Sequence, residues 1–258
     1  MFDKIKTLIW FIKHPSYWDH AIELILRKFR SDLDGEAYAY SAKIWAKERV
    51  STVSDALISL GFLSENSTAP QLSKILIDEA KELEKKSPIE MGGPGDIDLI
   101  YAAVLLSGAK SIIETGIGYG WSSLAILAAL ENEKCSKLIS VDMPYPKLNN
   151  EASVGIIVPN RLRDNWIIIR KPDRKGLLDA INLSLAKIDL CHYDSDKSWW
   201  GRDFAFPLLW DALRPGGLFI SDDIQDNMYF ARFSEKKGTP MAVVEFDGKF
   251  IGLLRKPI

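Results

Sequence analysis

The chain has 258 residues and a formal net charge of −2, with 47% hydrophobic and 26% charged residues. This composition is that of a soluble globular protein with one large domain, or one domain with an appendage. The near balance of charge argues against a nucleic-acid partner. Two isolated cysteines and three scattered histidines exclude a disulfide framework and a zinc site, and they favour a reducing, cytoplasmic location.

The chain begins with a short apolar segment flanked by lysines. Its run Leu8–Ile12 is too short to span a bilayer, and no small-residue cleavage site follows it. We therefore expect neither a transmembrane segment nor a signal peptide. The spacing predicts an amphipathic helix over 5–12 that packs on its own domain, while contact with a partner subunit or a membrane surface stays open.

Residues 1–90 are predicted to be mostly helical. Apolar spacing indicates further helices over 17–29, 37–50, 53–60 and 72–85, and no strand. We interpret 1–90 as an N-terminal helical region that forms a lid over a site or the interface of a homodimer.

Beyond the glycine- and proline-rich hinge 91–96, predicted strands and helices alternate. Repeated strand–helix units are typical of a parallel sheet covered on both faces. The fold class predicted for 91–258 is α/β, a doubly wound Rossmann-like sheet of seven strands, mostly parallel, with a terminal antiparallel hairpin. The expected strands are 111–114, 137–141, 166–169, 188–193, 218–221 and the hairpin 242–246 with 249–254; the expected helices are 97–107, 121–130, 177–186 and 205–213, with a turn at 214–217 and loops at 144–150 and 226–240.

The first strand of this domain ends on Glu114 and leads into glycines at 116, 118 and 120. A dinucleotide site prefers G-x-G-x-x-G, whereas the spacing here is E-x-G-x-G-x-G. A carboxylate at this turn repels phosphate and attracts a cationic ligand. Asp142 follows 28 residues later, at a strand end where it can accept hydrogen bonds from ribose hydroxyls. This pair indicates a positively charged nucleoside without phosphate, S-adenosylmethionine.

Further acids end the later strands, at Asp194 and at the pair Asp222–Asp223. Because parallel strands end at one edge of a sheet, these acids are expected to gather around one crevice. Like charges that gather need a cation or a hydrogen-bond donor to balance them.

From Met91 onward, the chain resembles class I S-adenosylmethionine-dependent methyltransferases, and among them the catechol, caffeoyl-coenzyme A and sugar O-methyltransferases. The motifs MGGPGD, ETGIGYGWSS, SVDM, HYDSDKSWW, LRPGG and SDD occur in the family's order over the last two-thirds of the chain. The resemblance implies that the hinge closes over the cofactor and that the glycine turn flanks its methionine part. It also implies a serine that binds the methionine carboxylate, an acid that binds the ribose, and residues that lie next to the adenine. These cofactor-binding residues are Met91, Gly93, Glu114, Gly116, Gly118, Gly120, Ser122, Asp142, Met143 and Asp173.

The resemblance also implies a divalent metal, Mg²⁺ or else Mn²⁺ or Ca²⁺, on Asp194, Asp222 and Asp223. It makes Lys197 the general base, with a pKa lowered by the metal, and Asp194 a second catalytic residue. The catechol type has Asp-Asn where this chain has Asp222–Asp223, and the acidic pair of the sugar-modifying relatives shifts the expected acceptor toward saccharides. A histidine is the base in some relatives, but His192 is expected to point elsewhere from inside its strand.

The predicted reaction is methyl transfer from S-adenosylmethionine to a hydroxyl of a small molecule or saccharide. Three alternatives stay open: a protein that binds S-adenosylmethionine without catalysis, a metal-independent methyltransferase for another acceptor atom, and a nicotinamide dehydrogenase. No motif identifies the acceptor, whose specificity is expected to lie in the helical region and in the loops 144–160 and 226–240.

Overall fold

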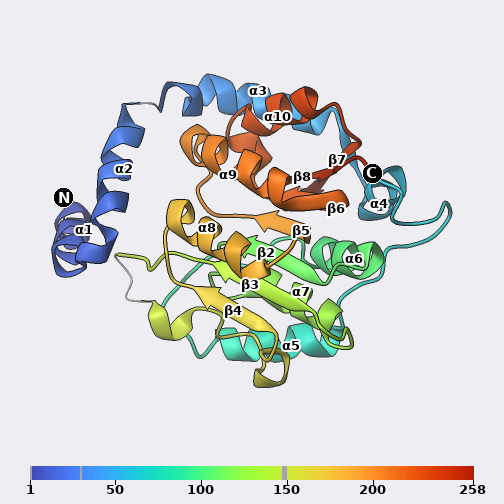
Figure 1. The fold of residues 1–258 in the computed structure, drawn as a ribbon, viewed down its shortest axis with the longest axis horizontal. Helices are drawn as coiled ribbons and strands as arrows, with labels where there is room; N and C mark the ends of the chain where they lie inside the picture. Colours follow the sequence, from blue (N-terminus) through green and yellow to red (C-terminus); the bar gives the residue numbers. More distant parts are fainter. Residues whose placement is uncertain (1, 30, 147–149) are drawn as a thin grey trace.

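The structure is a computed structural model that describes residues 2–29, 31–146 and 150–258 and is built around one sheet of eight strands (Figure 1). The strand order is β1-β7-β8-β6-β5-β2-β3-β4, and only β8 runs antiparallel to its neighbours, β6 and β7. The strands are β1 (Val50–Ser51), β2 (Ser111–Thr115), β3 (Lys137–Val141), β4 (Trp166–Ile169), β5 (Ile188–Tyr193), β6 (Leu213–Ser221), β7 (Met241–Phe246) and β8 (Lys249–Arg255). The predicted fold class, including the terminal hairpin, is confirmed.

Helices cover both faces of this sheet, and none of those in the described ranges is long and apolar enough to cross a membrane. The α-helices are α1 (Phe2–Lys13), α2 (Trp18–Lys28), α3 (Glu36–Lys47), α4 (Val53–Ser59), α5 (Lys74–Glu84), α6 (Ile97–Ser107), α7 (Trp121–Leu130), α8 (Asp173–Ser184), α9 (Trp199–Ala212) and α10 (Tyr229–Lys237).

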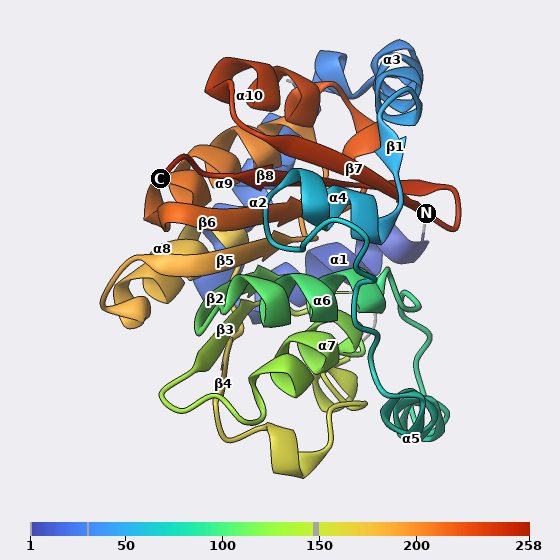
Figure 2. The ribbon, with the colours of Figure 1, turned by 90° about the vertical axis from the view of Figure 1, so that its right-hand side faces the viewer.

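Neighbouring residues of the central strands pack into two different cores. Ile112 of β2 lies in the core that α4, α6 and α7 share, whereas Ile113 lies in the core of α8, α9 and α10. The reason is the two-residue period of a strand, which turns successive side chains to opposite faces. Figure 2 shows α4, α6 and α7 in front of the sheet, with α8, α9 and α10 beyond it. Because both faces are covered, polar residues concentrate at the strand ends.

The eighth strand, β1, lies in the region that we predicted to be mostly helical and without strands. Val50 pairs with Val243, and Ser51 with Val244, at the edge of the sheet. Two residues are too few to show the alternation that identifies a strand in a sequence. The prediction of seven strands was therefore one short, because this strand forms only through pairing with β7.

Two helices differ from the prediction for local reasons: α9 begins earlier, and α10 was not predicted. α9 begins at Trp199 rather than at 205, because the Ser198 hydroxyl accepts the N–H of Gly201 and caps the helix. α10 occupies most of the loop predicted at 226–240, and its Phe230 and Phe233 are buried. The segment was predicted as a loop because polar residues flank these two phenylalanines and mask the apolar spacing of a helix.

The remaining differences concern turns. β6 already begins at Leu213 and runs through the turn predicted at 214–217, with a register shift beside Ile188 of β5. α8 begins at Asp173 rather than at 177. Of the loop predicted at 144–150, residues 147–149 lie outside the described residues.

Candidate active site

A cavity of about 1500 Å³ lies at the carboxyl ends of the parallel strands. Its walls come from the hinge before α6, the loop after β2, the ends of β3, β5 and β6, and the inner side of α2. Eleven of the fourteen residues predicted for the site line it: Met91, Gly93, Gly116, Gly118, Ser122, Asp142, Met143, Asp173, Asp194, Lys197 and Asp222. Glu114, Gly120 and Asp223 lie behind this wall.

The loop after β2 is possible only with glycine. Gly116, Gly118 and Gly120 have φ values of 78°, 53° and 99°, in the left-handed region that other residues avoid. A Cβ on Gly116 would lie 2.1 Å from the main-chain oxygen of Asp194, whereas one on Gly118 would meet nothing within 4 Å. The loop therefore packs its backbone against β5 and leaves open space on the cavity side.

Glu114 supports this loop through hydrogen bonds on the side away from the cavity. Its carboxylate is fully buried and accepts hydrogen bonds from the hydroxyls of Ser122 (2.5 Å), Ser123 (2.6 Å) and Ser140 (2.7 Å). The Ser122 proton that was expected to bind a methionine carboxylate is thus donated to Glu114. As at helix N-termini in general, the first N–H groups of α7 have no acceptor within the helix and can serve as donors.

Asp142, the predicted ribose acid, is held from both sides. Its Oδ1 accepts the N–H of Ile117 at 3.2 Å, and its Oδ2 is paired with the guanidinium of Arg170. Burial raises the pKa of Asp142, and Arg170 opposes that rise. Arg170 also forms an ion pair with Glu151 at 2.9 Å. Sequence reasoning missed Arg170, because nothing in the spacing tied it to Asp142.

The hinge is tied to the glycine loop through one side chain. The Tyr119 hydroxyl donates to the carbonyl oxygen of Ile89 at 2.6 Å and accepts the N–H of Met91 at 2.9 Å. A Cβ on Gly93 would meet no atom within 4 Å, so the hinge leaves room at the cavity. This contact places the predicted hinge residues beside the predicted cofactor loop.

Asp173 begins α8 beside the end of β5. It accepts the Ser195 hydroxyl at 2.5 Å and the Tyr193 hydroxyl at 3.4 Å. Burial raises the pKa of Asp173 to about 6. Asp173 therefore joins the adenine side of the predicted site to the strand that carries Asp194.

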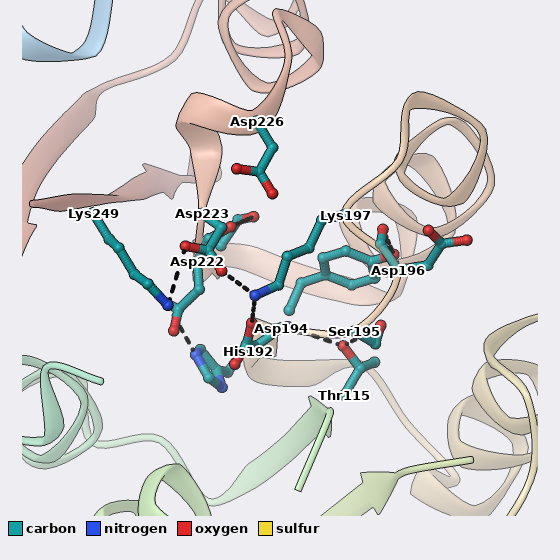
Figure 3. A network of polar contacts seen from close by, with 12 residues as sticks. Thr115, His192, Asp194, Ser195, Asp196, Lys197, Asp222, Asp223, Asp226 and Lys249 are labelled. Atoms are coloured by element: carbon teal, nitrogen blue, oxygen red, sulfur yellow. Dashed lines mark hydrogen bonds and ion pairs between the residues drawn. The ribbon is translucent and has the colours of Figure 1, made fainter. Parts of the chain in front are cut away.

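The acids at the ends of β5 and β6 surround a lysine ammonium (Figure 3). Lys197 Nζ is paired with Asp223 Oδ2 and lies 3.3 Å from Asp194 Oδ1. Lys249 Nζ lies 3.7 Å from the other oxygen of Asp223. Burial would lower the pKa of Lys197, but Asp194 and Asp223 outweigh it and raise that pKa. In this structure the surroundings of Lys197 thus oppose the lowered pKa that we expected of a general base.

His192 lies inside this network rather than pointing elsewhere as expected. Its Nε2 is 3.3 Å from Asp222 Oδ1, and its Nδ1 is 3.9 Å from Glu114 Oε1. Burial would lower the pKa of His192, but Asp222 and Glu114 outweigh it and raise it to about 10. The sequence did hold a signal, since residues 192 and 194 are two apart and alternate residues of a strand share one face.

The predicted metal ligands do not fit a metal ion as they are arranged. Asp223 is already paired with Lys197, and Asp222 is bonded to His192. In the described parts of the chain, no group of three or more His, Cys, Asp or Glu side chains is placed to hold a metal. The cation that the clustered acids require is supplied here by Lys197 and His192.

Helix α2 forms one wall of the cavity. Arg27 Nη1 lies 3.0 Å from Asp196 Oδ1, and Glu23 Oε1 lies 3.1 Å from Arg174 Nε. The Tyr17 hydroxyl, just before α2, donates to the carbonyl oxygen of Arg170 at 2.8 Å. These contacts connect the N-terminal helices to both the cofactor side and the acidic side of the site.

Residues 113–224 match the family model described as a methyltransferase domain, and no curated protein matches the chain. The matched range runs from β2 to just past the acids at the end of β6. Over this range the chain is therefore similar to methyltransferase domains, which agrees with the resemblance seen in its motifs.

Solved methyltransferase structures share the fold at low identity. The O-methyltransferase from Bacillus cereus in complex with S-adenosylhomocysteine is 15% identical, with a TM-score of 0.55 over 80% of this chain and 100% of the other. A methyltransferase from Podospora anserina bound to the same product is 15% identical (TM-score 0.56, 77% and 94% covered). One from Geobacter sulfurreducens is 16% identical (TM-score 0.55, 72% and 92% covered).

Proposed function

We propose that this chain transfers a methyl group from S-adenosylmethionine to a hydroxyl oxygen of a small molecule or saccharide. The observation that carries the proposal is that one cavity joins the glycine loop and Asp142 to Asp194 and Lys197. The first pair suits a cationic nucleoside, and the second suits a hydroxyl that must lose its proton. The cofactor supplies an electrophilic methyl group beside a sulfonium.

The residues on the cofactor side fit this ligand. The open space beside Gly93 and Gly118 admits a chain that a Cβ would obstruct. The Asp142 carboxylate, oriented by Arg170 and by the N–H of Ile117, can accept ribose hydroxyls. No phosphate site is required, which separates this proposal from a nicotinamide dehydrogenase.

On the acceptor side, we place the proton acceptance on Asp194. It lines the cavity, and burial together with the carboxylate of Asp222 raises its pKa to about 6. An acid with a pKa near the working pH is an efficient base. Lys197, whose charge is fixed by two carboxylates, would hold Asp194 in place and donate to the acceptor oxygen. As the methyl carbon leaves sulfur and bonds to that oxygen, the hydroxyl proton passes to Asp194, and the sulfonium charge is lost.

The metal-assisted form of this reaction stays a prediction. A divalent ion on Asp194, Asp222 and Asp223 would have to displace the ammonium of Lys197 and the imidazole of His192 from their partners. Oxygen ligands of this kind suit Mg²⁺, Mn²⁺ or Ca²⁺. Measuring the reaction with chelator and with each metal separates the two forms.

The N-terminal helices are proposed to act as a lid. The ion pairs from α2 to Asp196 and Arg174 hold the helix over the cavity, and both are partly exposed to solvent. Exposed pairs are weak, each contributing about 0–1 kcal/mol, so the lid can open to admit an acceptor.

The test is methyl transfer to a pool of diols, sugars and amines, with S-adenosylhomocysteine release as the readout. We expect turnover with the native chain, loss of about 100-fold or more with Asp194→Asn, and native turnover with Asp179→Asn on the outer side of α8. Calorimetry with S-adenosylmethionine runs in parallel. Cofactor binding without turnover, under any metal, would favour the binding protein over the enzyme, and transfer to nitrogen alone would favour the alternative acceptor atom. Tight binding of NAD instead would favour a dehydrogenase.

A further inference from the structure

The two N-terminal helices carry apolar faces that are exposed to solvent. On α1 the exposed side chains recur at helical spacing, at Ile5, Leu8, Ile9 and Ile12, and α2 with the residue after it continues the pattern. Nine of the twenty large apolar side chains that are exposed in the described ranges belong to residues 5–29. Single exposed apolar residues are ordinary, but a cluster of this kind marks an interaction surface.

Helix α2 turns its polar face toward its own domain and its apolar face outward, the reverse of the usual arrangement. His20, Glu23 and Arg27 face the cavity, where the last two form ion pairs with the body of the domain. The opposite side of the helix consists of exposed apolar residues, and no residue of α2 is buried. These exposed residues are Trp18, Ile22, Ile25 and Leu26, followed by Phe29, which is 81% exposed. The usual arrangement places the apolar stripe inward, so this face is left for something outside the chain.

Figure 1 shows α1 and α2 together at one edge of the molecule, next to the N-terminus. We define the apolar face as the exposed apolar side chains of this edge. They are Ile5, Leu8, Ile9, Ile12, Trp18, Ile22, Ile25, Leu26 and Phe29.

The charge of the chain is divided unevenly between this edge and the rest. Residues 1–30 contain six basic and three acidic residues, whereas 31–258 contain 27 basic and 32 acidic residues. Two of the three acids, Asp19 and Glu23, are paired with Lys175 (2.6 Å) and Arg174 (3.1 Å) of the body. Of the basic residues, Lys13 is exposed, whereas Arg27 is paired with Asp196 and Lys28 lines the cavity. The apolar face therefore lies on the basic end of an otherwise acidic molecule.

This distribution of charge indicates which partner covers the apolar face. An isologous contact between two copies would bring the same basic segment against itself. A bilayer that contains anionic lipids attracts basic residues near the surface by about 1 kcal/mol each and accepts apolar side chains at its interface. We propose that the apolar face of α1 and α2 docks the protein on an anionic lipid surface, with the helices lying in the plane of the interface.

The test uses the full chain and vesicles of phosphatidylcholine, with or without phosphatidylglycerol, in a sedimentation assay at low and high salt. We expect the protein to bind vesicles that contain phosphatidylglycerol at least about tenfold more tightly than vesicles of phosphatidylcholine alone. Binding to the anionic vesicles should also weaken at high salt. Ile22→Gln/Ile25→Gln and Leu8→Gln/Ile12→Gln should each reduce binding by about tenfold or more. Ile75→Gln, on the exposed side of α5, is the matched control and should bind like the native chain.

Light scattering on the same variants provides the second readout, and circular dichroism confirms that each is folded. Absence of vesicle binding by a folded native chain would overturn the proposal, as would a dimer that the α2 substitutions dissociate. Equal binding to both kinds of vesicle would overturn the selection of anionic lipid. None of these readouts depends on methyl transfer, so they stand apart from the proposed reaction.

Discussion

A Cβ atom on Gly116 would lie 2.1 Å from the main-chain oxygen of Asp194, so the cofactor loop and the acidic strand end touch only because residue 116 has no side chain. Gly116 also has a φ of 78°, which other residues adopt only with strain. This close approach adds to the hydrogen bonds that Asp194 and Ser195 make with Thr115, and together they hold the two halves of the proposed site next to each other.

Gly116→Ala should therefore reduce both stability and cofactor binding. We expect the free energy of unfolding to fall by about 3 kcal/mol, because strain and a backbone clash act together. Thermal denaturation and calorimetry measure the two effects. Gly35→Ala is the control, since residue 35 lies outside the cavity and its Cβ would come no closer than 3.6 Å to another atom. A variant at 116 as stable as the control would contradict the contact.

Glu114→Gln should destabilise the loop by removing a hydrogen-bond acceptor of the serine hydroxyls that support it. Ser123 and Ser140 both donate to Oε2, and Ser140 already accepts the indole N–H of Trp166 at 2.8 Å. An amide NH₂ at that position cannot accept, so at least one hydroxyl loses its partner at a cost of about 1–3 kcal/mol. Urea unfolding measures the loss. The exposed Glu65→Gln should leave the unfolding midpoint unchanged, and an equal midpoint for both variants would show that the serine cluster contributes nothing.

Removal of Arg170 should weaken cofactor binding without abolishing the fold. Arg170→Met leaves the buried Asp142 carboxylate without its charged partner and free to turn from the ribose position. We expect the Kd for S-adenosylmethionine to rise about tenfold in calorimetry. Arg161→Met removes an exposed pair with Glu79 and should leave the Kd unchanged. An unchanged Kd in both variants would mean that Asp142 needs no support from Arg170.

Asp173 should make stability depend on pH. Its folded-state pKa of about 6 exceeds the ordinary value of 3.8, so its contribution is fully present below about 4 and is lost as pH rises through 6. From pH 7.5 to 4.5 the native chain should gain stability relative to Asp173→Asn, by at most about 3 kcal/mol. Denaturant titrations at each pH measure this difference. Asp179→Asn on the same helix is the control, and a difference that stays constant with pH would contradict a raised pKa at Asp173.

The sequence by itself determined the strands β2 to β8, the helices between β2 and β6, the glycine loop and the acids at the strand ends. These features are local: a strand, a turn that needs glycine and a carboxylate that follows can each be recognised within a few residues, and a parallel sheet brings its strand ends to one edge. That is why eleven of the fourteen predicted residues line one cavity.

Only the tertiary structure decided which charged side chains pair with one another. Three contacts show this: Lys197 with its two carboxylates, His192 with Asp222, and Arg170 with Asp142. Each joins side chains that are 3 to 30 residues apart in sequence but within a few ångströms in space. The two-residue strand β1 and the outward apolar face of α2 have the same origin. A helical period shows that a helix has two faces, but only the packed molecule shows which face is turned inward.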